Sequence, residues 1–228
     1  MAIVTAASKG LGRATAAALA AEGANVIVNA RNAAALADLA AELGDALAVP
    51  GDITDPRVPG QLIEAAVAQW GRVDIVVGNA GGPPTGRALD VTDAQIVEAV
   101  EANALASIRL ARAAVPHMRE RNWGRVCFIA SASVRQPIPD LALSNMSRTA
   151  LWAWTKTAAQ DLADQGITVN VAAPGLHATD RLIERGVTGR TGDPTDFGKV
   201  VAFLCSEPAR FISGAAVGVD GGAVTGLL

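Results

Sequence analysis

The sequence predicts an α/β fold: a single Rossmann-type, doubly wound domain with a parallel seven-stranded sheet flanked by helices on both faces. Seven short β-branched or apolar runs alternate with longer Ala/Leu-rich stretches along the chain. The runs are almost wholly apolar, as expected for strands that are buried on both sides. No Pro-, Gly- or Ser-rich linker divides the 228 residues, so one domain over 1–228 is expected.

Each predicted strand is a short run that ends in small or polar residues. The runs are AIVT (2–5), NVIV (25–28), ALAV (46–49), DIVVGNAG (74–81), GRVCFIAS (124–131), ITVNVAAPG (167–175) and AAVGVDGG (215–222). Helical patterns lie between them at about 10–22, 32–43, 56–69, 93–121, 143–165 and 195–206, and the fourth is long enough to be broken into two. This alternation is typical of a parallel sheet covered on both faces.

Composition excludes several functional classes. The net charge is -3, and Lys and Arg are scattered, so no basic face for nucleic acid or an anionic membrane is expected. No apolar run approaches the roughly 18 residues of a membrane span, and no basic leader precedes the first strand, which predicts a cytoplasmic protein. Cys127 and Cys205 are far apart in the sequence and lack His or Cys neighbours at ligand spacing, so neither a disulfide framework nor a metal site is expected.

A glycine-containing loop, TAASKGLGRA (5–14), joins the first predicted strand to an Ala-rich helix. Gly10 and Gly12 would let the backbone approach a pyrophosphate, whose charge the positive end of the helix beginning near Leu11 would favour. An ordinary strand–helix turn is the alternative. Arg31, after the second strand, lies where a Rossmann-type fold reaches the adenosine ribose. With Lys9 it favours a 2′-phosphate, and hence NADP(H) over NAD(H), unless both are merely solvated surface charges.

Ordered motifs extend this pattern along the chain, which resembles the short-chain dehydrogenase/reductase family over essentially its whole length. TAASKGLG resembles TGxxxGxG, GDITD (51–55) the adenine-contacting DxxD region, GNAG (78–81) NNAG and PGLHAT (174–179) PGxxxT; Asn103, Ser131 and VDGG (219–222) also match. Two positions depart from the family pattern, because Ala6 replaces the first loop glycine and Gly78 replaces the first Asn of NNAG.

The resemblance implies a set of cofactor-binding residues. Asp52 and Ile53 would hold the adenine, and Pro174, Gly175 and Thr179 would lie beside the nicotinamide. The full set is Thr5, Ser8, Lys9, Gly10, Leu11, Gly12, Arg31, Asn32, Asp52, Ile53, Asn79, Ala80, Gly81, Arg148, Pro174, Gly175 and Thr179.

The catalytic positions are altered, because the chain contains no tyrosine. The family's Ser, Tyr and Lys fall on Ser131, Ser144 and Arg148, and the resemblance adds Asn103 to the catalytic set. A lysine normally lowers the pKa of a phenol from near 10 so that it exchanges a proton at neutral pH. Ser144 is shorter and less acidic, so it would act through a water or a shifted substrate. Arg148 keeps the positive charge but does not release a proton.

For several other residues the sequence leaves two alternative roles open. His177 is a candidate to replace the phenol, because histidine is the usual acid–base residue near neutral pH, although a lone loop histidine is usually a surface residue. Asp140 would orient a water or serve as a helix N-cap. Trp152 and Trp154 would be core or subunit-interface anchors, and the resemblance implies a homo-oligomer, a tetramer or dimer. The substrate loop at about 176–193 is short for the family, which implies an open pocket for a bulky or carrier-linked substrate.

Three functions fit these observations. The leading one is an NADP(H)-dependent oxidoreductase that interconverts a carbonyl and an alcohol, similar to 3-oxoacyl-carrier-protein reductases, with a small-molecule or acyl-carrier-linked substrate. A non-redox lyase of the halohydrin-dehalogenase type would match Arg148, but not the missing tyrosine or the retained glycine loop. A catalytically inert NADP(H)-binding protein would need only the fold and the cleft.

Overall fold

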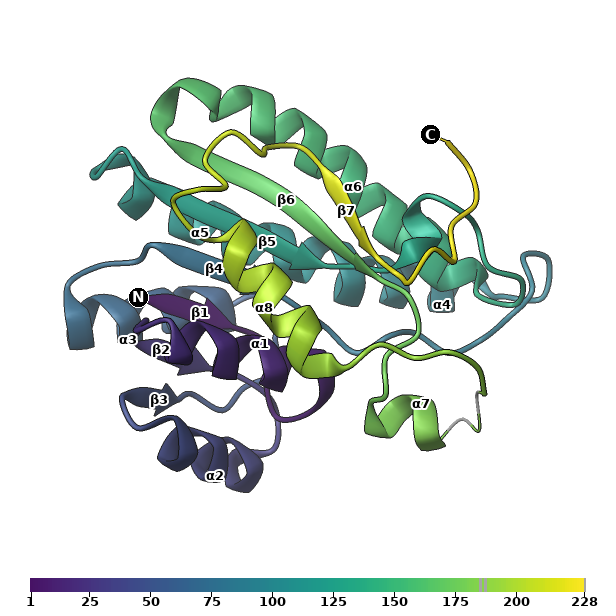
Figure 1. Ribbon diagram of the computed structural model, residues 1–228, viewed down its shortest axis with the longest axis horizontal. Coiled ribbons are helices and arrows are strands. Elements are labelled where there is room, and N and C mark those ends of the chain that lie inside the picture. The colour runs from purple at the N-terminus through teal and green to yellow at the C-terminus, as the bar shows by residue number, and fades with distance from the viewer. Residues whose placement is uncertain (185, 187, 228) are drawn as a thin grey trace.

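The computed structural model describes residues 1–184, 186 and 188–227, and its described strands form one parallel sheet. The strand order is β3-β2-β1-β4-β5-β6-β7, which confirms the predicted fold class (Figure 1). The strands are β1 Ala2–Val4, β2 Val26–Val28, β3 Ala46–Ala48, β4 Ile75–Gly78, β5 Gly124–Ile129, β6 Ile167–Pro174 and β7 Ala216–Val219. β4 ends at Gly78, so Asn79, Ala80 and Gly81 belong to the following loop.

The helices follow the predicted order, with two differences. They are α1 Gly10–Ala21, α2 Ala33–Leu43, α3 Val58–Trp70, α4 Asp93–Val100, the π-helical turn η1 Glu101–Leu105, α5 Ala106–Arg119, the 3₁₀ turn η2 Ala132–Val134, α6 Ala142–Asp161, the 3₁₀ turn η3 Ala163–Gln165, α7 Asp180–Glu184 and α8 Pro194–Leu204. The long helix predicted at 93–121 is interrupted by a π turn. The short α7 escaped the sequence analysis because five residues are too few to show a helical period.

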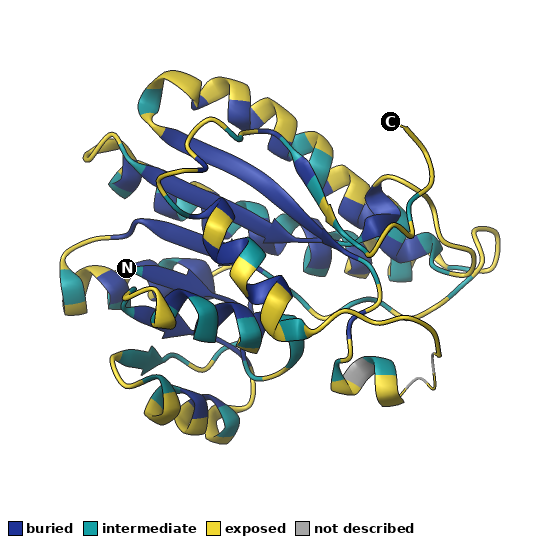
Figure 2. Ribbon diagram, in the orientation of Figure 1, coloured by how far each residue is buried: buried dark blue, intermediate teal, exposed yellow. Residues whose placement is uncertain are grey.

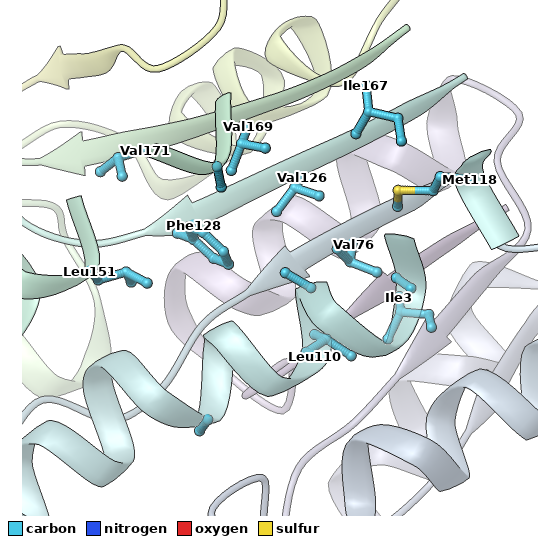
Figure 3. Close-up of a cluster of buried hydrophobic side chains, with 14 of the residues drawn as sticks. Ile3, Val76, Leu110, Met118, Val126, Phe128, Leu151, Ile167, Val169 and Val171 are labelled. Carbon is cyan, nitrogen blue, oxygen red and sulfur yellow. The ribbon is translucent and has the colours of Figure 1, made fainter. Parts of the chain in front are cut away.

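Alternate strand residues point to opposite faces of the sheet, and each face has its own hydrophobic cluster. Ile3 packs in the cluster that contains Leu62 of α3, Leu110 of α5 and Leu151 of α6 (Figure 3). Val4 packs in the other cluster, under α1, α2 and α8. Because both faces are covered, β1, β2, β4, β5 and β6 are buried along their whole length (Figure 2), and their sequences are mainly apolar, with Arg125, Thr168 and Asn170 as polar exceptions. The edge strands β3 and β7 are partly exposed.

The two cysteines illustrate how the fold unites distant segments. Cys127 of β5 and Cys205, which follows α8, are both buried in the cluster under α8, and neither forms a disulfide. A hydrogen bond with Cys127, together with burial, raises the pKa of the Cys205 thiol. Cys205 is therefore a protonated thiol of the core.

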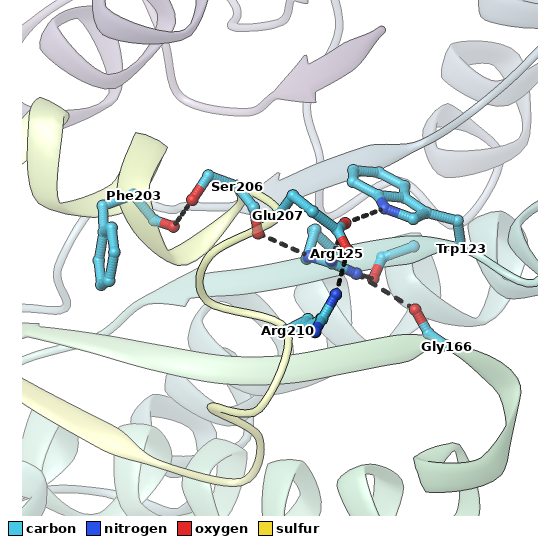
Figure 4. A network of polar contacts seen from close by, with 8 residues as sticks. Trp123, Arg125, Gly166, Phe203, Ser206, Glu207 and Arg210 are labelled. Carbon is cyan, nitrogen blue, oxygen red and sulfur yellow. Dashed lines mark hydrogen bonds and ion pairs between the residues drawn. The ribbon is translucent and has the colours of Figure 1, made fainter.

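A polar cluster fastens the segment after α8 to the amino end of β5 (Figure 4). The buried Arg125 guanidinium donates to the carbonyl oxygens of Gly124, Gly166 and Ser206 at 2.9, 3.2 and 3.1 Å. It also pairs with Glu207 at 3.1 Å and lies over the Trp123 ring. This charge is satisfied at the end of the strands opposite the glycine loop, so it serves the fold.

Two aromatic residues of α6 also support the core. Trp154 packs edge-on against Phe128 with ring centroids 6.0 Å apart, which confirms a core role for it. Trp152 is half-buried, and its indole Nε1 is buried without a hydrogen-bond partner among the described residues. No helix in the described part of the chain is long and apolar enough to cross a membrane.

Candidate active site

The glycine loop between β1 and α1 is tied to the loop after β4 by reciprocal hydrogen bonds. The Thr5 hydroxyl donates to the Asn79 carbonyl oxygen at 2.7 Å and accepts from the Asn79 amide at 2.8 Å. The Asn79 side-chain amide donates to the Ala6 carbonyl oxygen at 3.4 Å. These bonds bring together two of the segments that the sequence assigned to the cofactor.

The loop packs too closely to admit a side chain at Gly12. A Cβ atom there would lie 2.4 Å from the Ala6 carbonyl oxygen and 2.7 Å from the Asn79 amide nitrogen. Gly10 has φ +58°, and Ala6, at the family's first glycine, has φ +47°. The alanine therefore keeps the left-handed turn of the motif, at a cost of about 1–2 kcal/mol for an L-residue.

The amino end of α1 is open to a ligand. Its N-cap residue is Lys9, whose side chain makes no capping hydrogen bond. The first amide groups of the helix are thus not occupied by a cap, and the positive end of the helix dipole favours an anion there. A tight loop that carries no side chain at Gly10 or Gly12, followed by an uncapped helix, fits a dinucleotide pyrophosphate.

The residues proposed to contact adenosine gather around the ends of β2 and β3. Arg31 Nη1 lies 3.9 Å from Asp52 Oδ2, and the Arg31 side chain is 83% exposed. Hydrogen bonds from the Thr54 amide and hydroxyl to Asp52, with the charge of Arg31, hold the pKa of this carboxyl below its usual value. Asn32 caps α2 by accepting from the Ala35 amide at 3.1 Å, which gives it a structural role in addition to the proposed one.

Asn29 was not singled out in the sequence, yet the fold buries it at the end of β2. Its amide donates to the carbonyl oxygens of Val49 and Gly51 at 3.0 and 3.3 Å, which fastens the segment leading to Asp52. Its Oδ1 is buried and has no partner among the described residues. The signal in the sequence was a polar residue at the end of an apolar strand.

The segment that is proposed to lie beside the nicotinamide approaches the glycine loop. A Cβ atom on Gly10 would be 3.5 Å from Cγ2 of Thr179, and one on Gly175 would be 2.8 Å from Cα of Asp220. Pro174 ends β6 and is buried. Four of the remaining proposed contacts, Ser8, Ile53, Ala80 and Gly81, lie in loops that follow β1, β3 and β4, and Leu11 lies in the first turn of α1.

Asn103 lies in the π-helical turn between α4 and α5. Its amide donates to the Ala99 carbonyl oxygen at 3.2 Å, while its Oδ1 is buried without a partner in the described part of the chain. π turns often mark functional sites, and a buried acceptor without a donor calls for a water or ligand. The sequence placed Asn103 in a long helix but gave no sign of the π turn.

Ser131 follows β5 and begins η2. Its Oγ accepts from the Ser133 amide at 3.1 Å, so the acceptor side of this hydroxyl is engaged and its hydrogen can be donated elsewhere. Ser144 is buried in the first turn of α6, with 8% exposure, and Arg148 lies one turn further along. All three side chains thus come from segments at the carboxyl end of β5.

Arg148 is buried, and its Nη1 donates to the carbonyl oxygens of both Ile129 and Ala130 at 2.9 Å. These two residues come directly before Ser131. Arg148 is among the cofactor-binding residues that the family resemblance implies, and in the structure its Nη1 donates to the backbone just before Ser131. Its contact with a cofactor stays a prediction.

His177 is buried, so the expectation of a surface residue is wrong. Its ring packs edge-on against Phe197 of α8 at 5.2 Å, and Nδ1 lies 3.3 Å from the Gly175 carbonyl oxygen. A Cβ atom on Gly192 would lie 2.9 Å from Nε2. His177 therefore fastens both ends of the segment 176–192 to α8, because core packing outweighed the polar preference of a lone loop histidine.

The simpler interpretation, that Asp140 is the N-cap of α6, is wrong. The N-cap residue is Leu141, and no side chain caps this helix. Asp140 is exposed, has φ +60°, and accepts through its carbonyl oxygen from the Gly86 amide at 2.8 Å. The shortened substrate loop at 176–193 includes residues 185 and 187, which lie outside the described residues.

A cavity of about 470 Å³ opens beside Asp140 at the start of α6. Its lining is mostly polar and comprises Thr85, Gly86, Arg87, Asp90, Val91, Gln95 and Asp140. Another cavity, of about 430 Å³, lies near Asn25 and Trp70, away from every proposed site residue. In the described residues, no three His, Cys, Asp or Glu side chains cluster in a way that could hold a metal ion.

Comparison with known proteins gives matches along the whole chain. A sequence profile of the family described as enoyl-(acyl carrier protein) reductase matches residues 5–224. The chain is 35% identical to dehydrogenase/reductase SDR family member 4 of Sus scrofa, covering 100% of this chain and 88% of that protein. It is 34% identical to versicolorin reductase of Emericella nidulans, covering 98% and 95%. The structure of L-sorbose reductase from Gluconobacter frateurii, complexed with NADPH and L-sorbose, has a TM-score of 0.94 at 30% identity and covers 99% of this chain and 97% of that one.

Proposed function

Because this chain belongs to the short-chain dehydrogenase/reductase family, we propose that it is an NADP(H)-dependent oxidoreductase that interconverts a carbonyl and an alcohol through an atypical Ser/Ser/Arg site. The observation that carries the proposal is the glycine loop, where Gly12 leaves no room for a side chain and the amino end of α1 is uncapped. L-sorbose reductase, which was crystallised with NADPH, supports the choice of cofactor.

The nucleotide half of the site would bind NADP(H) through the loop and two cations. The amide groups of the loop and of α1 would hold the pyrophosphate, while Lys9 and Arg31 would receive the 2′-phosphate. Asp52, held by Thr54, would lie at the adenine. When bound, the nicotinamide supplies or accepts a hydride at the substrate carbon.

Ser131 would polarise the carbonyl. Because its Oγ already accepts from the Ser133 amide, its hydrogen would be donated to the substrate oxygen. Arg148 acts as a positioning residue, since it fixes the carbonyl groups of Ile129 and Ala130 that precede Ser131.

Proton transfer would rely on water. A serine hydroxyl is too weak an acid to replace a phenol, and the Arg148 guanidinium does not release its proton. Ser144 and the unpartnered Oδ1 of Asn103 would hold a water, which gives its proton to the carbonyl oxygen during reduction and is left as hydroxide until solvent restores it. This site keeps carbonyl polarisation but lacks a tuned acid, so slow turnover is expected.

The substrate would be a ketone of the 3-oxoacyl type or similar, entering beside Asp140. The polar lining of the 470 Å³ cavity favours a ketone with polar groups near its carbonyl, and the same opening would admit a carrier-linked chain. We also propose a cytoplasmic homo-oligomer, a dimer or tetramer, as the family resemblance implies. Partial exposure of Trp152 on α6 supports that helix as one contact surface.

The first experiment is a calorimetric titration of the protein with NADPH and, separately, with NADH. Tight, NADPH-selective binding is the expected result, followed by NADPH oxidation with members of a ketone panel. Ser131→Ala should then reduce turnover strongly, while Ser206→Ala, at the far end of the sheet, should leave it unchanged.

Two results would replace this proposal. Tight NADPH binding without turnover on any ketone would indicate a binding protein, and the bonds of Arg148 to backbone carbonyls are compatible with that function. Failure to bind either nucleotide, with halide release from a halohydrin, would indicate the lyase.

A further inference from the structure

Glu184, the last residue of α7, faces the cation of the glycine loop. Its Oε1 lies 3.8 Å from Lys9 Nζ, and the two side chains are 66% and 61% exposed. The residue before α7 also touches the loop, because a Cβ atom on Gly10 would be 3.5 Å from Thr179 Cγ2. The segment that bears Glu184 is therefore seated against the loop that is proposed to bind NADP(H).

Arg31, the other cation that is proposed to bind the 2′-phosphate, also has an acidic neighbour, but that neighbour is held by other hydrogen bonds. Asp52 lies 3.9 Å from Arg31, but its other oxygen accepts from the amide and hydroxyl of Thr54 at 3.0 and 2.8 Å. Asp52 is thus anchored beside the adenine position by its own turn. Glu184 is different because it approaches Lys9 from a separate short helix, α7.

We propose that Glu184 determines how strongly this chain distinguishes NADPH from NADH, because it competes with the 2′-phosphate for Lys9. This inference rests on the proposed NADP(H) function. A 2′-phosphate brings a second dense negative charge to the same ammonium group, and two anions that share one cation repel each other. NADH, which lacks that phosphate, leaves the Lys9–Glu184 pair intact.

The expected effect is modest because both side chains are exposed. Exposed ion pairs contribute little in water, so removing the Glu184 charge should tighten binding of the 2′-phosphate by about two- to fivefold. The gain should shrink as salt screens the repulsion. A ligand without the 2′-phosphate should show no gain.

The test compares two ligand fragments that do not need catalysis. Adenosine 2′,5′-bisphosphate carries the discriminating phosphate, and adenosine 5′-monophosphate lacks it. Calorimetry should show about two- to fivefold tighter binding of the bisphosphate to Glu184→Gln than to the native chain, with monophosphate binding unchanged. Glu42→Gln is the matched control, since Glu42 pairs with Arg13 of α1 and its loss removes the same charge elsewhere.

A second variant tests the route through Lys9. On a Lys9→Met background, Glu184→Gln should no longer tighten bisphosphate binding, because the contested cation is gone. Unchanged or weaker bisphosphate binding to Glu184→Gln in the native background would overturn the inference, as would an equal gain in Glu42→Gln.

The outcomes also separate this inference from the proposed cofactor preference. If the native chain fails to distinguish the two fragments and Glu184→Gln does distinguish them, Glu184 competes as proposed while the native NADP(H) preference is wrong. If neither protein distinguishes them, both proposals fall.

Discussion

The half of the site that is proposed to bind the nucleotide and the half around α6 both contain buried polar side chains. The two halves differ in the groups to which these side chains are hydrogen-bonded. Around the glycine loop, Thr5 and Asn79 satisfy each other, and the amino end of α1 remains open. Around α6, the Arg148 cation donates to the backbone of Ile129 and Ala130. The parts of the site that we propose for cofactor binding and for proton transfer therefore come from separate elements, so one can change while the other is retained.

The half around α6, where the family resemblance implies altered catalytic residues, is still polar, because it contains Ser131, Ser144, Asn103 and Arg148. What is missing is an acid with a pKa that a neighbour can tune. The following substitutions test this contrast in order of decreasing expected effect.

Restoring the family residues should produce the largest change. Ser144→Tyr combined with Arg148→Lys would return a phenol and a neighbouring ammonium to α6, and we expect NADPH-dependent ketone reduction to rise by about 10²- to 10⁴-fold. Initial rates of NADPH oxidation would measure the gain. Ser144→Phe with Arg148→Lys is the control, because it adds the ring without the hydroxyl. An equal gain in the control would contradict the missing-acid explanation.

Gly12→Ala should disrupt the glycine loop and so weaken the proposed binding of NADPH. Its Cβ would lie 2.4 Å from the Ala6 carbonyl oxygen, and relieving that overlap would distort the loop and weaken NADPH binding by about 3 kcal/mol, or roughly 100-fold. Calorimetry would measure the loss. Gly60→Ala is the control, since no atom lies within 4 Å of a Cβ there, within α3. Native NADPH affinity in Gly12→Ala would refute the assignment of this loop.

Arg148→Met should lower the free energy of unfolding by about 2 kcal/mol, because two buried carbonyl groups lose their donor. Urea unfolding would measure this. NADPH affinity should fall less than in Gly12→Ala, and Arg148→Lys should recover part of the stability. Unchanged stability with lost NADPH binding would instead place the guanidinium at the cofactor.

Ala6→Gly should have the smallest effect. Relief of the strain at φ +47° is partly offset by the greater freedom of glycine in the unfolded chain, which leaves a gain of about 0.5 kcal/mol. Thermal unfolding and an NADPH titration would measure stability and affinity, with affinity unchanged. Ala68→Gly, on the exposed side of α3, should instead lose about 1 kcal/mol. A loss in Ala6→Gly would show that the alanine is not strained.

The positions of the strands were predictable because a strand that is buried on both faces is apolar at consecutive positions. The main helices were predictable from the helical period of their apolar residues. Val26–Val28 and Ile75–Gly78 are apolar at consecutive positions, which is the pattern of a central parallel strand. α7 was missed because it is shorter than two helical turns. The site residues were located by motif and spacing, yet spacing did not reveal that Arg148 donates to the backbone before Ser131.

By itself, the sequence determined the sheet, the glycine turn and the absence of a phenol, because these depend on residue type and on neighbours along the chain. Tertiary structure decided the direction of Arg148, the π turn at Asn103, the burial of His177 against Phe197 and the approach of Glu184 to Lys9. Each of these depends on which distant segment supplies a hydrogen-bond partner, a packing surface or an opposite charge. Such contacts form only when the sheet has ordered its strands.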